Sequence, residues 1–417
     1  MLDTTPRFDM TRRPMRQHLR FLIWALCRPS LWLHRNKLTK VDMEGVKPPY
    51  LLLCNHNAFM DFKVASRATF PHRANFVVAI DGFIGREWLL RFIGCICKRK
   101  FTRDTVMVRH LKRVIKAGDI AAIYPEARYS LCGTTAVLPA SLGKLAKFLK
   151  VPVVTLICNG HHINSPFWNL PDRGVKPTTA TMRCILTAED VKTLPHEQLT
   201  EIIEDAFQYD DYCWQKENNI RVTYPERAKG LHKVLYQCPH CGKEYAMTSA
   251  GTRLSCTACG KQWEMTELGE LRAVEGETEF SHIPDWYEWE RKNVRAEIER
   301  GEYAFRCRAR VDALPNARRF IDLGMAELRH DMTGFTLTGT EPDGASYEVH
   351  IPAHTQYSCH IEYEYLGKHG DCIDLNTDKD TLYIYPQDCD FSVTKLALAT
   401  EELYAYHHAR AQVKKGS

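Results

Sequence analysis

Short apolar runs alternate with amphipathic segments over roughly the first half of the chain. The run Tyr50-Leu51-Leu52-Leu53-Cys54 is typical of a short buried strand, and Thr105 to Ala117 carries apolar residues at helical spacing. Similar patterns predict strands at 75–80, 95–98, 119–124, 151–158 and 180–186, helices at 14–36, 60–70, 85–92, 142–149 and 197–216, and a hairpin or paired strands at 42–55. Strands that alternate with helices predict an α/β architecture: a mixed, largely parallel sheet flanked by helices, with functional groups at strand ends.

The pattern changes in the last third of the chain. Pro284 to Arg300 predicts a charged helix that carries tryptophans, and Ser392 to Ala411 predicts a helical tail. Between them lie seven strand-like runs at hairpin spacing: 303–311, 319–328, 334–338, 346–351, 356–365, 371–375 and 381–385. A mostly β domain closed by a helix is compatible with a pleckstrin-homology-like barrel. That interpretation rests on the strand count alone and does not determine a function.

Two Cys-x2-Cys pairs stand between these regions. Cys238 and Cys241 precede Gly242, and fourteen residues separate them from Cys256 and Cys259, which precede Gly260. Each pair presents two thiolates on a tight turn that glycine permits, so the spacing predicts a zinc ribbon with a closed, structural four-thiolate site. A disulfide or a redox pair is the alternative. His240 is interpreted as a loop residue, because four sulfurs complete a tetrahedron.

Composition is that of a globular protein with two or three domains. Of the 417 residues, 44% are hydrophobic and 26% are charged. The longest apolar run, Phe21 to Cys27, ends before Pro29 and is too short to span a membrane. The N-terminus has no signal-peptide pattern, and the 16 cysteines outline no disulfide framework. We therefore expect a cytoplasmic protein.

Charge is distributed unevenly along the chain. Residues 1–227 carry a net +13 and residues 228–417 a net −8. Basic clusters lie at Arg7 to Arg20 and at Arg86 to Lys116, and the first adjoins the apolar and aromatic segment that ends near Trp32. Such a basic, aromatic and amphipathic segment predicts peripheral binding to an anionic membrane surface, on the inner face of the cell membrane. Nucleic acid is not expected as a partner, because the chain lacks a recognition-helix or RNA-binding motif.

Candidate chemistry follows the first buried strand, in Asn55-His56-Asn57-Ala58-Phe59-Met60-Asp61. A histidine followed five residues later by an aspartate at a strand end can close into one turn. The carboxylate then accepts a hydrogen bond from one imidazole nitrogen, which leaves the other nitrogen free as a proton acceptor. The segment therefore predicts that His56 is a general base and that Asp61 orients it.

Four segments in order resemble the glycerolipid acyltransferase family, which includes 1-acylglycerol-3-phosphate acyltransferases. The family pattern is Asn-His-x4-Asp, a Gly-led segment that ends in Arg, Phe-Pro-Glu-Gly-Thr-Arg-Ser, and Val-Pro-Val followed by an apolar residue and Pro. Their counterparts begin at Asn55, Gly94, Tyr124 and Val151, within roughly residues 40–160. The resemblance implies transfer of a fatty acyl group from an acyl-CoA or acyl-carrier-protein thioester to a hydroxyl of a lysophospholipid. The favoured acceptor is 1-acyl-glycerol-3-phosphate.

The resemblance also assigns roles to individual residues. His56 and Asp61 are the expected catalytic residues. Four others are expected to bind substrate: Asn55, Arg99, Glu126 and Arg128. The cations Lys98, Lys100 and Arg103 surround Arg99, and an anionic phosphate needs such donors.

Three departures from the family pattern concern the acceptor. Ala127-Arg128-Tyr129 replaces Gly-Thr-Arg, and Thr155 stands where the last block has Pro. In the second block the family arginine could fall on Arg99, but Lys98, Lys100 and Arg103 lie close enough to leave this assignment open. They leave two alternatives open, an acyltransferase with another lipid acceptor and a non-catalytic lipid-binding scaffold. The expected organisation is a membrane-associating helical region (1–40), an acyltransferase domain (41–227), a zinc ribbon (228–270) and a β-rich domain with a C-terminal helix (280–417).

Overall fold

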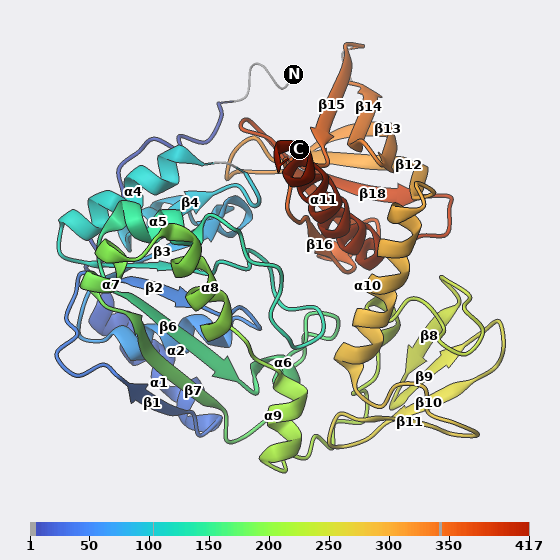
Figure 1. The fold of residues 1–417 in the computed structure, drawn as a ribbon, viewed down its shortest axis with the longest axis horizontal. Coiled ribbons are helices and arrows are strands. Elements are labelled where there is room, and N and C mark those ends of the chain that lie inside the picture. The colour runs from blue at the N-terminus through green and yellow to red at the C-terminus, as the bar shows by residue number, and fades with distance from the viewer. Residues whose placement is uncertain (1–5, 103, 342–343, 417) are drawn as a thin grey trace.

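Three β-sheets organise the chain in the computed structural model, which describes residues 6–102, 104–341 and 344–416 (Figure 1). The first sheet has the order β1-β7-β6-β2-β5-β3-β4. Its strands are β1 (Lys37–Val41), β2 (Leu51–Cys54), β3 (Ala74–Ala79), β4 (Ile96–Lys98), β5 (Ile120–Ile123), β6 (Val153–Asn159) and β7 (Thr179–Leu186). Neighbouring strands are parallel except β6 and β7, which are antiparallel. The prediction of a mixed, largely parallel sheet is confirmed.

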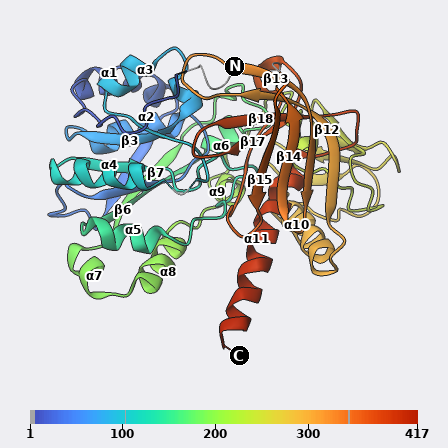
Figure 2. The ribbon, with the colours of Figure 1, turned by 90° about the horizontal axis from the view of Figure 1, so that it is seen from above.

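Helices cover both faces of this sheet (Figure 2). They are α1 (Arg20–Leu33), α2 (Met60–Thr69), α3 (Glu87–Phe92), α4 (Thr105–Lys116), α5 (Leu142–Leu149), α6 (His161–Asn164), α7 (Ala188–Thr193), α8 (His196–Ala206) and α9 (Asp211–Glu217), with a short 3-10 helix η2 (Ile80–Phe83). Alternate residues of β2 point to opposite faces. Leu51 and Leu53 pack with residues of α4, α5 and α8, whereas Leu52 and Cys54 pack with residues of α1 and α2. The apolar run of β2 therefore reflects burial on both faces of the sheet.

Two predicted elements differ from the structure. Residues 42–55 do not form a hairpin: β1 ends at Val41 and pairs with β7, while β2 pairs with β5 and β6. A hairpin was expected because apolar runs that are close in sequence commonly pair, but crossovers separate these two in the sheet. The helix expected at 197–216 is two helices. Asp210 accepts the backbone N–H groups of Tyr212 and Cys213 and so begins α9 as a new helix.

The second sheet is antiparallel and has the order β11-β10-β9-β8. Its strands, β8 (Met247–Ala250), β9 (Arg253–Cys256), β10 (Gln262–Met265) and β11 (Leu271–Ala273), follow the 3-10 helix η3 (Leu231–Lys233) and precede α10 (Ile283–Glu299). The second cysteine pair lies at the end of β9 and in the turn that follows it. The first pair lies in the segment before β8.

The third sheet is antiparallel, with the order β15-β14-β13-β12-β18-β17-β16. All seven strand-like runs contribute to it, as β12 (Ala304–Ala313), β13 (Ile321–Asp331), β14 (Gly334–Thr340), β15 (Ser346–Pro352), β16 (His360–Glu362), β17 (Cys372–Asn376) and β18 (Thr381–Gln387). The 3-10 helix η4 (Tyr365–Gly367) lies between β16 and β17, and α11 (Val393–Gly416) follows. The pleckstrin-homology-like assignment stays a prediction.

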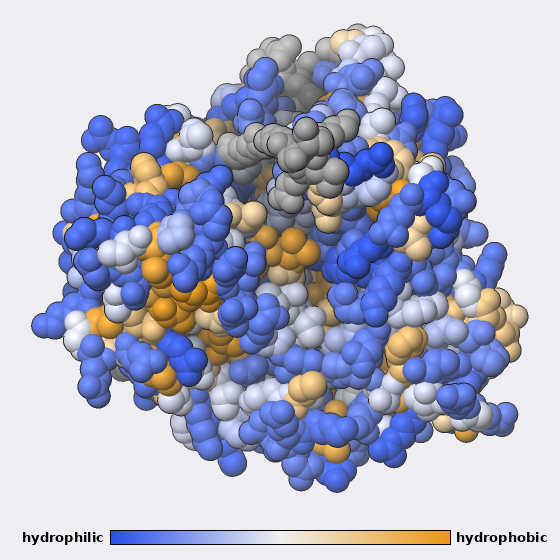
Figure 3. Space-filling model, in the orientation of Figure 1, coloured by the Kyte–Doolittle hydropathy of each residue, from blue (hydrophilic) through white to orange (hydrophobic). Residues whose placement is uncertain are grey.

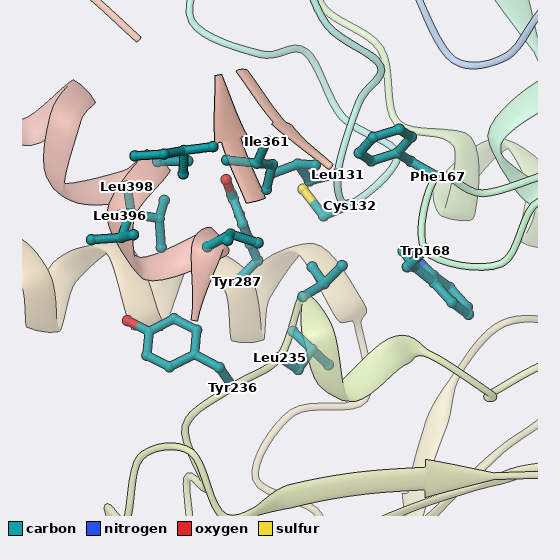
Figure 4. Packing of buried hydrophobic residues seen from close by; sticks show 14 of the residues in the cluster. Leu131, Cys132, Phe167, Trp168, Leu235, Tyr236, Tyr287, Ile361, Leu396 and Leu398 are labelled. Carbon is teal, nitrogen blue, oxygen red and sulfur yellow. The ribbon is translucent and has the colours of Figure 1, made fainter. Parts of the chain in front are cut away.

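One hydrophobic cluster joins the parts of the chain. It includes Leu131 and Cys132, the loop residues Phe167 and Trp168, Tyr287 of α10, Ile361 of β16 and Leu396 of α11 (Figure 4). Buried residues of the second sheet, such as Trp263 of β10, belong to the same cluster. The C-terminal parts therefore pack against the α/β domain through a continuous apolar core.

The described residues include no helix with the length and the hydropathy that a membrane span requires. On the face shown in Figure 3, apolar side chains gather over the N-terminal α/β domain, while the C-terminal half is mainly hydrophilic.

Candidate active site and metal centre

His56 lies just beyond the end of β2, the middle strand of the first sheet. Its ring centroid is 4.3 Å from that of Tyr124 and 4.3 Å from that of Tyr129, so two tyrosines hold the imidazole. The side chain is 24% exposed, whereas Nδ1 is buried and lies 3.6 Å from Asp61 Oδ2. His56 therefore has one buried ring nitrogen beside a carboxylate and a ring that solvent reaches in part.

Asp61 is fully buried in the first turn of α2. Its Oδ2 accepts the backbone N–H groups of Asn57 (2.6 Å) and Ala58 (2.8 Å), which closes the turn that the sequence predicts. Burial by itself raises the pKa of Asp61, but the proximity of His161 and His56 outweighs it and lowers the pKa to about 2. The Asp61 carboxylate is therefore ionised at neutral pH.

The shortest hydrogen bond of Asp61 is made to a residue that the sequence analysis missed. His161 Nδ1 lies 2.5 Å from Asp61 Oδ1, and both side chains are fully buried. His161 begins α6, directly after β6, which runs parallel to β2. The carboxyl ends of adjacent parallel strands meet at one edge of the sheet, so a histidine just after β6 was a signal that could have been used.

A second buried carboxylate holds His161 in place. Asp211, at the start of α9, accepts the backbone N–H groups of Gly160 (2.8 Å), His162 (2.9 Å) and Ile163 (3.4 Å). Burial raises the pKa of Asp211 to about 6 despite these donors. The short helix α6 is therefore anchored by a residue about fifty positions further along the chain.

Glu126 supports His56 from the turn that follows β5, the neighbouring strand of the sheet. Its carboxylate accepts the backbone N–H of His56 (3.1 Å), the N–H of Ala136 (2.9 Å) and the hydroxyl of Tyr209 (3.0 Å). Burial is the largest influence and raises the pKa of Glu126 to about 8. Glu126 was predicted to bind substrate; the structure places it behind the backbone of His56.

Asn55 also has a scaffold position, although substrate binding was predicted for it. Its Nδ2 donates to the carbonyl oxygen of Cys158 (2.9 Å), and its Oδ1 accepts the N–H of Cys158 (2.8 Å). The side chain is fully buried. Asn55 therefore ties the end of β2 to β6 with both halves of its amide and has no exposed group to offer a substrate.

Arg99 and Arg128, the predicted acceptor ligands, face the C-terminal domain. Arg99 is 3% exposed and donates to four acceptors there: Leu314 O (3.1 Å), Thr381 Oγ1 (2.7 Å), Pro315 O (3.1 Å) and Lys379 O (2.9 Å). Arg128 is 4% exposed and pairs with Glu401 of α11 (2.6 Å). Acceptor binding by these two arginines stays a prediction; in this structure their Nη donors bond to the C-terminal part of the chain, and both Nε atoms are buried without a partner.

Of the other predicted cations, Lys100 has acidic partners within the chain. Lys100 Nζ lies 3.4 Å from Asp81 Oδ2 and 3.7 Å from Asp374 Oδ2. Lys98 is half-buried, and desolvation lowers its pKa. Arg103 lies outside the described residues. Arg99 and Lys100, two cations of this cluster, are therefore bonded within the chain.

No nucleophilic thiol is needed beside His56. Cys54 and Cys158 are fully enclosed, and burial raises the pKa of both thiols. The Cys158 sulfur lies within 4.8 Å of the ligand atoms of Asp61 and His161, but the short Asp61–His161 hydrogen bond accounts for that grouping without an ion. The arrangement suits proton transfer to and from His56.

The four ribbon cysteines form a separate cluster whose sulfurs lie within 4.8 Å of one another. The Sγ atoms of Cys238 and Cys259 are 3.8 Å apart, as are those of Cys241 and Cys256. Gly242 and Gly260 have positive φ angles (73° and 77°) and donate their N–H groups back to the carbonyls of Cys238 and Cys256. Two matching turns with four converging thiols fit a tetrahedral zinc ion.

His240 lies outside this tetrahedron. Its ring binds Glu279 (3.2 Å), and its side chain is 54% exposed. A loop role was expected for it, and the position agrees with that expectation.

Residues 35–159 match the family model described as Acyltransferase. No curated protein matches the chain. Among solved structures, the chain is similar to the crystal structure of the 1-acyl-sn-glycerophosphate (LPA) acyltransferase, PlsC, from Thermotoga maritima. That similarity has a TM-score of 0.36 and 15% sequence identity, over 45% of this chain and 77% of that chain. The family match includes His56, Asp61 and Glu126 and ends two residues before His161.

Proposed function

We propose that this chain, whose residues 35–159 form an acyltransferase-family domain, transfers a fatty acyl group from a thioester to a hydroxyl group of a lysophospholipid. One observation carries the proposal. An ionised, buried Asp61 lies 3.6 Å from the buried Nδ1 of a partly exposed His56, at the carboxyl end of a central strand. Such a carboxylate orients an imidazole and stabilises the imidazolium that forms when the ring accepts a proton.

The proposed reaction is direct transfer without a covalent enzyme intermediate. His56 accepts the proton of the acceptor hydroxyl while the hydroxyl oxygen attacks the thioester carbonyl carbon. The tetrahedral intermediate collapses, the C–S bond breaks, and the leaving thiolate takes the proton from the His56 imidazolium. The products are an ester and a free thiol of CoA or of acyl-carrier protein, so atoms and charge balance.

His161 and Glu126 support this chemistry as positioning residues. His161 holds Asp61 Oδ1 while the turn amides hold Oδ2, which fixes the carboxylate plane relative to His56. Glu126 accepts the His56 backbone N–H and fixes the main chain. His56 is thus held in place through its partner carboxylate, Asp61, and through its own backbone.

Two acceptor classes remain under this proposal. A phosphorylated acceptor, 1-acyl-glycerol-3-phosphate, is the one that the family resemblance favours. An acceptor without a phosphate is favoured by a different observation: Arg99, Lys100 and Arg128 already have partners in the folded chain. Three carboxylates, those of Asp81, Glu362 and Asp374, also lie near Lys100. The surroundings of Tyr129, whose ring lies beside that of His56, therefore hold more carboxylates than cations.

The test is an acyl-transfer assay on the purified chain. Labelled acyl-CoA and acyl-carrier protein are each incubated with 1-acyl-glycerol-3-phosphate and with monoacylglycerol, and products are separated. His56→Ala should abolish transfer, and Asp61→Asn should lower kcat by roughly 100- to 10,000-fold. If His56→Ala retains wild-type turnover, His56 is not the base and the proposed mechanism is wrong. If the wild-type chain transfers no acyl group to either acceptor, the chain is better described as a lipid-binding scaffold.

We further propose that the ribbon holds one structural zinc and that the chain associates peripherally with an anionic membrane from the cytoplasmic side. The membrane proposal began from Arg12, Arg13, Arg16 and Arg20 beside Phe21, Trp24 and Trp32. Two of these arginines have partners within the protein, because Arg16 pairs with Asp119 and Arg20 donates to Pro71 O. The support for membrane association therefore comes from other side chains near α1.

A further inference from the structure

Helix α1 is apolar on both of its sides. Cys27 and Leu31 are buried against the sheet, but Leu22, Leu26 and Leu33 are exposed at intervals of four and seven residues on the outer side. Trp32 is 81% exposed and Leu26 is 70% exposed. A helix that presents a stripe of large apolar side chains to solvent is unusual for a soluble surface and is typical of a membrane-interface helix.

A basic groove of about 460 Å³ lies beside the end of this stripe. Its lining comes from α1, from the turn after it, from α2 and from the loop before β7: Arg28, Leu31, Trp32, Leu33, Arg35, Asn36, Arg67 and Lys176. Four of these eight residues are cations and none is acidic. The lining of the groove therefore combines cations with aromatic and aliphatic side chains.

The cations of the groove lack counterions. Within the described part of the chain, Arg28, Arg35 and Lys176 have no ion pair, and Arg67 Nη1 donates only to Asn36. The nearby carboxylate Asp172 pairs with His34. Burial, and in addition the nearby charge of Arg28, lowers the pKa of Arg67, so the two guanidinium groups repel one another. Like charges held together without a partner favour an anion between them.

We propose that this groove binds the phosphate headgroup of an anionic phospholipid in a bilayer, with Trp32, Leu33 and Leu26 entering the acyl-chain boundary. The inference rests on the proposed membrane association and is independent of acyl transfer. Arginines match phosphate oxygens in geometry, and a tryptophan beside them is suited to the headgroup level. Both features are present in one place.

The position of the groove relates it to the candidate active site. Asp61 lies in the first turn of α2 and Arg67 in its last turn, which separates them by about 9 Å along the helix axis. Phe59, just before α2, is 65% exposed. Docking at the groove therefore places the His56 end of α2 near the source of a lipid acceptor.

The experiment is vesicle co-sedimentation of the full chain. Vesicles are neutral phosphatidylcholine alone or with about one quarter phosphatidylglycerol. The test variant is Arg35→Gln with Lys176→Gln, because both side chains are exposed and unpartnered. The matched control is Lys116→Gln with Lys144→Gln, which removes the same charge from α4 and α5 on the other face of the sheet.

The groove variant should lose about 30-fold in affinity for anionic vesicles, at about fivefold per cation, and the control pair much less. Trp32→Ala should weaken binding to both kinds of vesicle. Equal losses in the groove and control pairs would overturn the proposal, because they would indicate diffuse charge attraction. So would full competition by millimolar inorganic phosphate, which would identify a free-anion site.

Binding is measured without an acyl donor, and His56→Ala should sediment with vesicles as the wild-type chain does. Loss of transfer in the acyl-transfer assay and loss of docking in this assay are therefore distinguishable. Thermal unfolding of each variant identifies any loss of fold, and a groove variant that unfolds early is replaced by Lys176→Gln alone, with an expected loss of about fivefold.

Discussion

Asp61 is shared by two imidazoles, and this sharing determines the chemistry at the residue scale. One oxygen accepts from His161 at 2.5 Å, and the other lies 3.6 Å from His56. The histidine nearest in sequence is therefore the weaker partner in this conformation. A carboxylate fixed by His161 and two backbone amides needs no further bond to stay oriented, which leaves His56 able to approach it as the ring gains a proton.

His161→Ala should lower kcat by roughly 10- to 100-fold with little change in the acceptor KM. The reason is the loss of a hydrogen bond to a charged group, worth about 1.5–3 kcal/mol. His161→Gln, which can still donate, should recover part of the loss. His162→Gln is the control, because His162 packs against Tyr212 instead. A rise in KM with unchanged kcat would contradict a positioning role.

Glu126 should make folding stability depend on pH. Its pKa is about 8 in the folded chain, against an ordinary value of 4.5. Between these values the folded state keeps a proton that the unfolded state has lost, so this contribution falls as pH rises, by up to about 1.4 kcal/mol per pH unit. Urea unfolding at pH 5 to 9 should show wild type losing stability relative to Glu126→Gln. A difference that is constant over this range would refute the raised pKa.

At the element scale, the ribbon depends on two turns of the same shape. Each Cys-x2-Cys pair ends at a glycine with positive φ, and the cysteine sulfurs converge from both turns. Cys238 and Trp263 of this region are buried in the cluster that also contains Tyr287 of α10. A structural change around the four cysteines should therefore also disturb the packing of α10 against the small sheet.

Metal analysis of the purified chain should give about one zinc per molecule. Removing it with a chelator, or replacing Cys238 or Cys256 by Ser, should lower the midpoint of thermal unfolding, because metal binding contributes directly to folding. Cys389→Ser, at an exposed cysteine outside the cluster, serves as the control. An unfolding midpoint that stays unchanged after metal removal would exclude a structural zinc.

At the scale of the whole molecule, two arginines of the α/β domain join it to the C-terminal domain. Arg99 reaches the segments at 314–315 and 379–381, and Arg128 reaches α11 through Glu401. Arg291 of α10 also bonds to Glu401, so the loop after β5 and the helices α10 and α11 meet at one carboxylate. The β-rich domain is thus part of the structure around the candidate active site.

Arg99→Ala should lower the free energy of unfolding by roughly 2–4 kcal/mol, because several buried acceptors lose their donor. Hydrogen exchange should quicken at residues 314–315 and 379–381. Arg86→Ala, at an exposed arginine of the same domain, is the matched control. Unchanged stability together with a raised acceptor KM would instead support the acceptor-binding role that the sequence predicts.

Local features of this chain were predictable from its sequence. The apolar run 50–54 required a buried strand, the turn from His56 to Asp61 closes within six residues, and each cysteine pair lies on its own short turn. The alternation of apolar and polar residues likewise predicts all seven strands of the last sheet. Periodicity records which side of an element is buried, and that information is local.

Partners distant in sequence were decided only by the tertiary structure. Nothing near Arg99 indicates that its donors meet carbonyls more than 200 residues away, and His161 meets Asp61 only because β6 lies beside β2. The same holds for the separation of β1 from β2 in the sheet. A long polar side chain binds whichever acceptor the packed fold brings within about 3 Å, and burial then makes that partner obligatory, because an unpaired buried charge is costly.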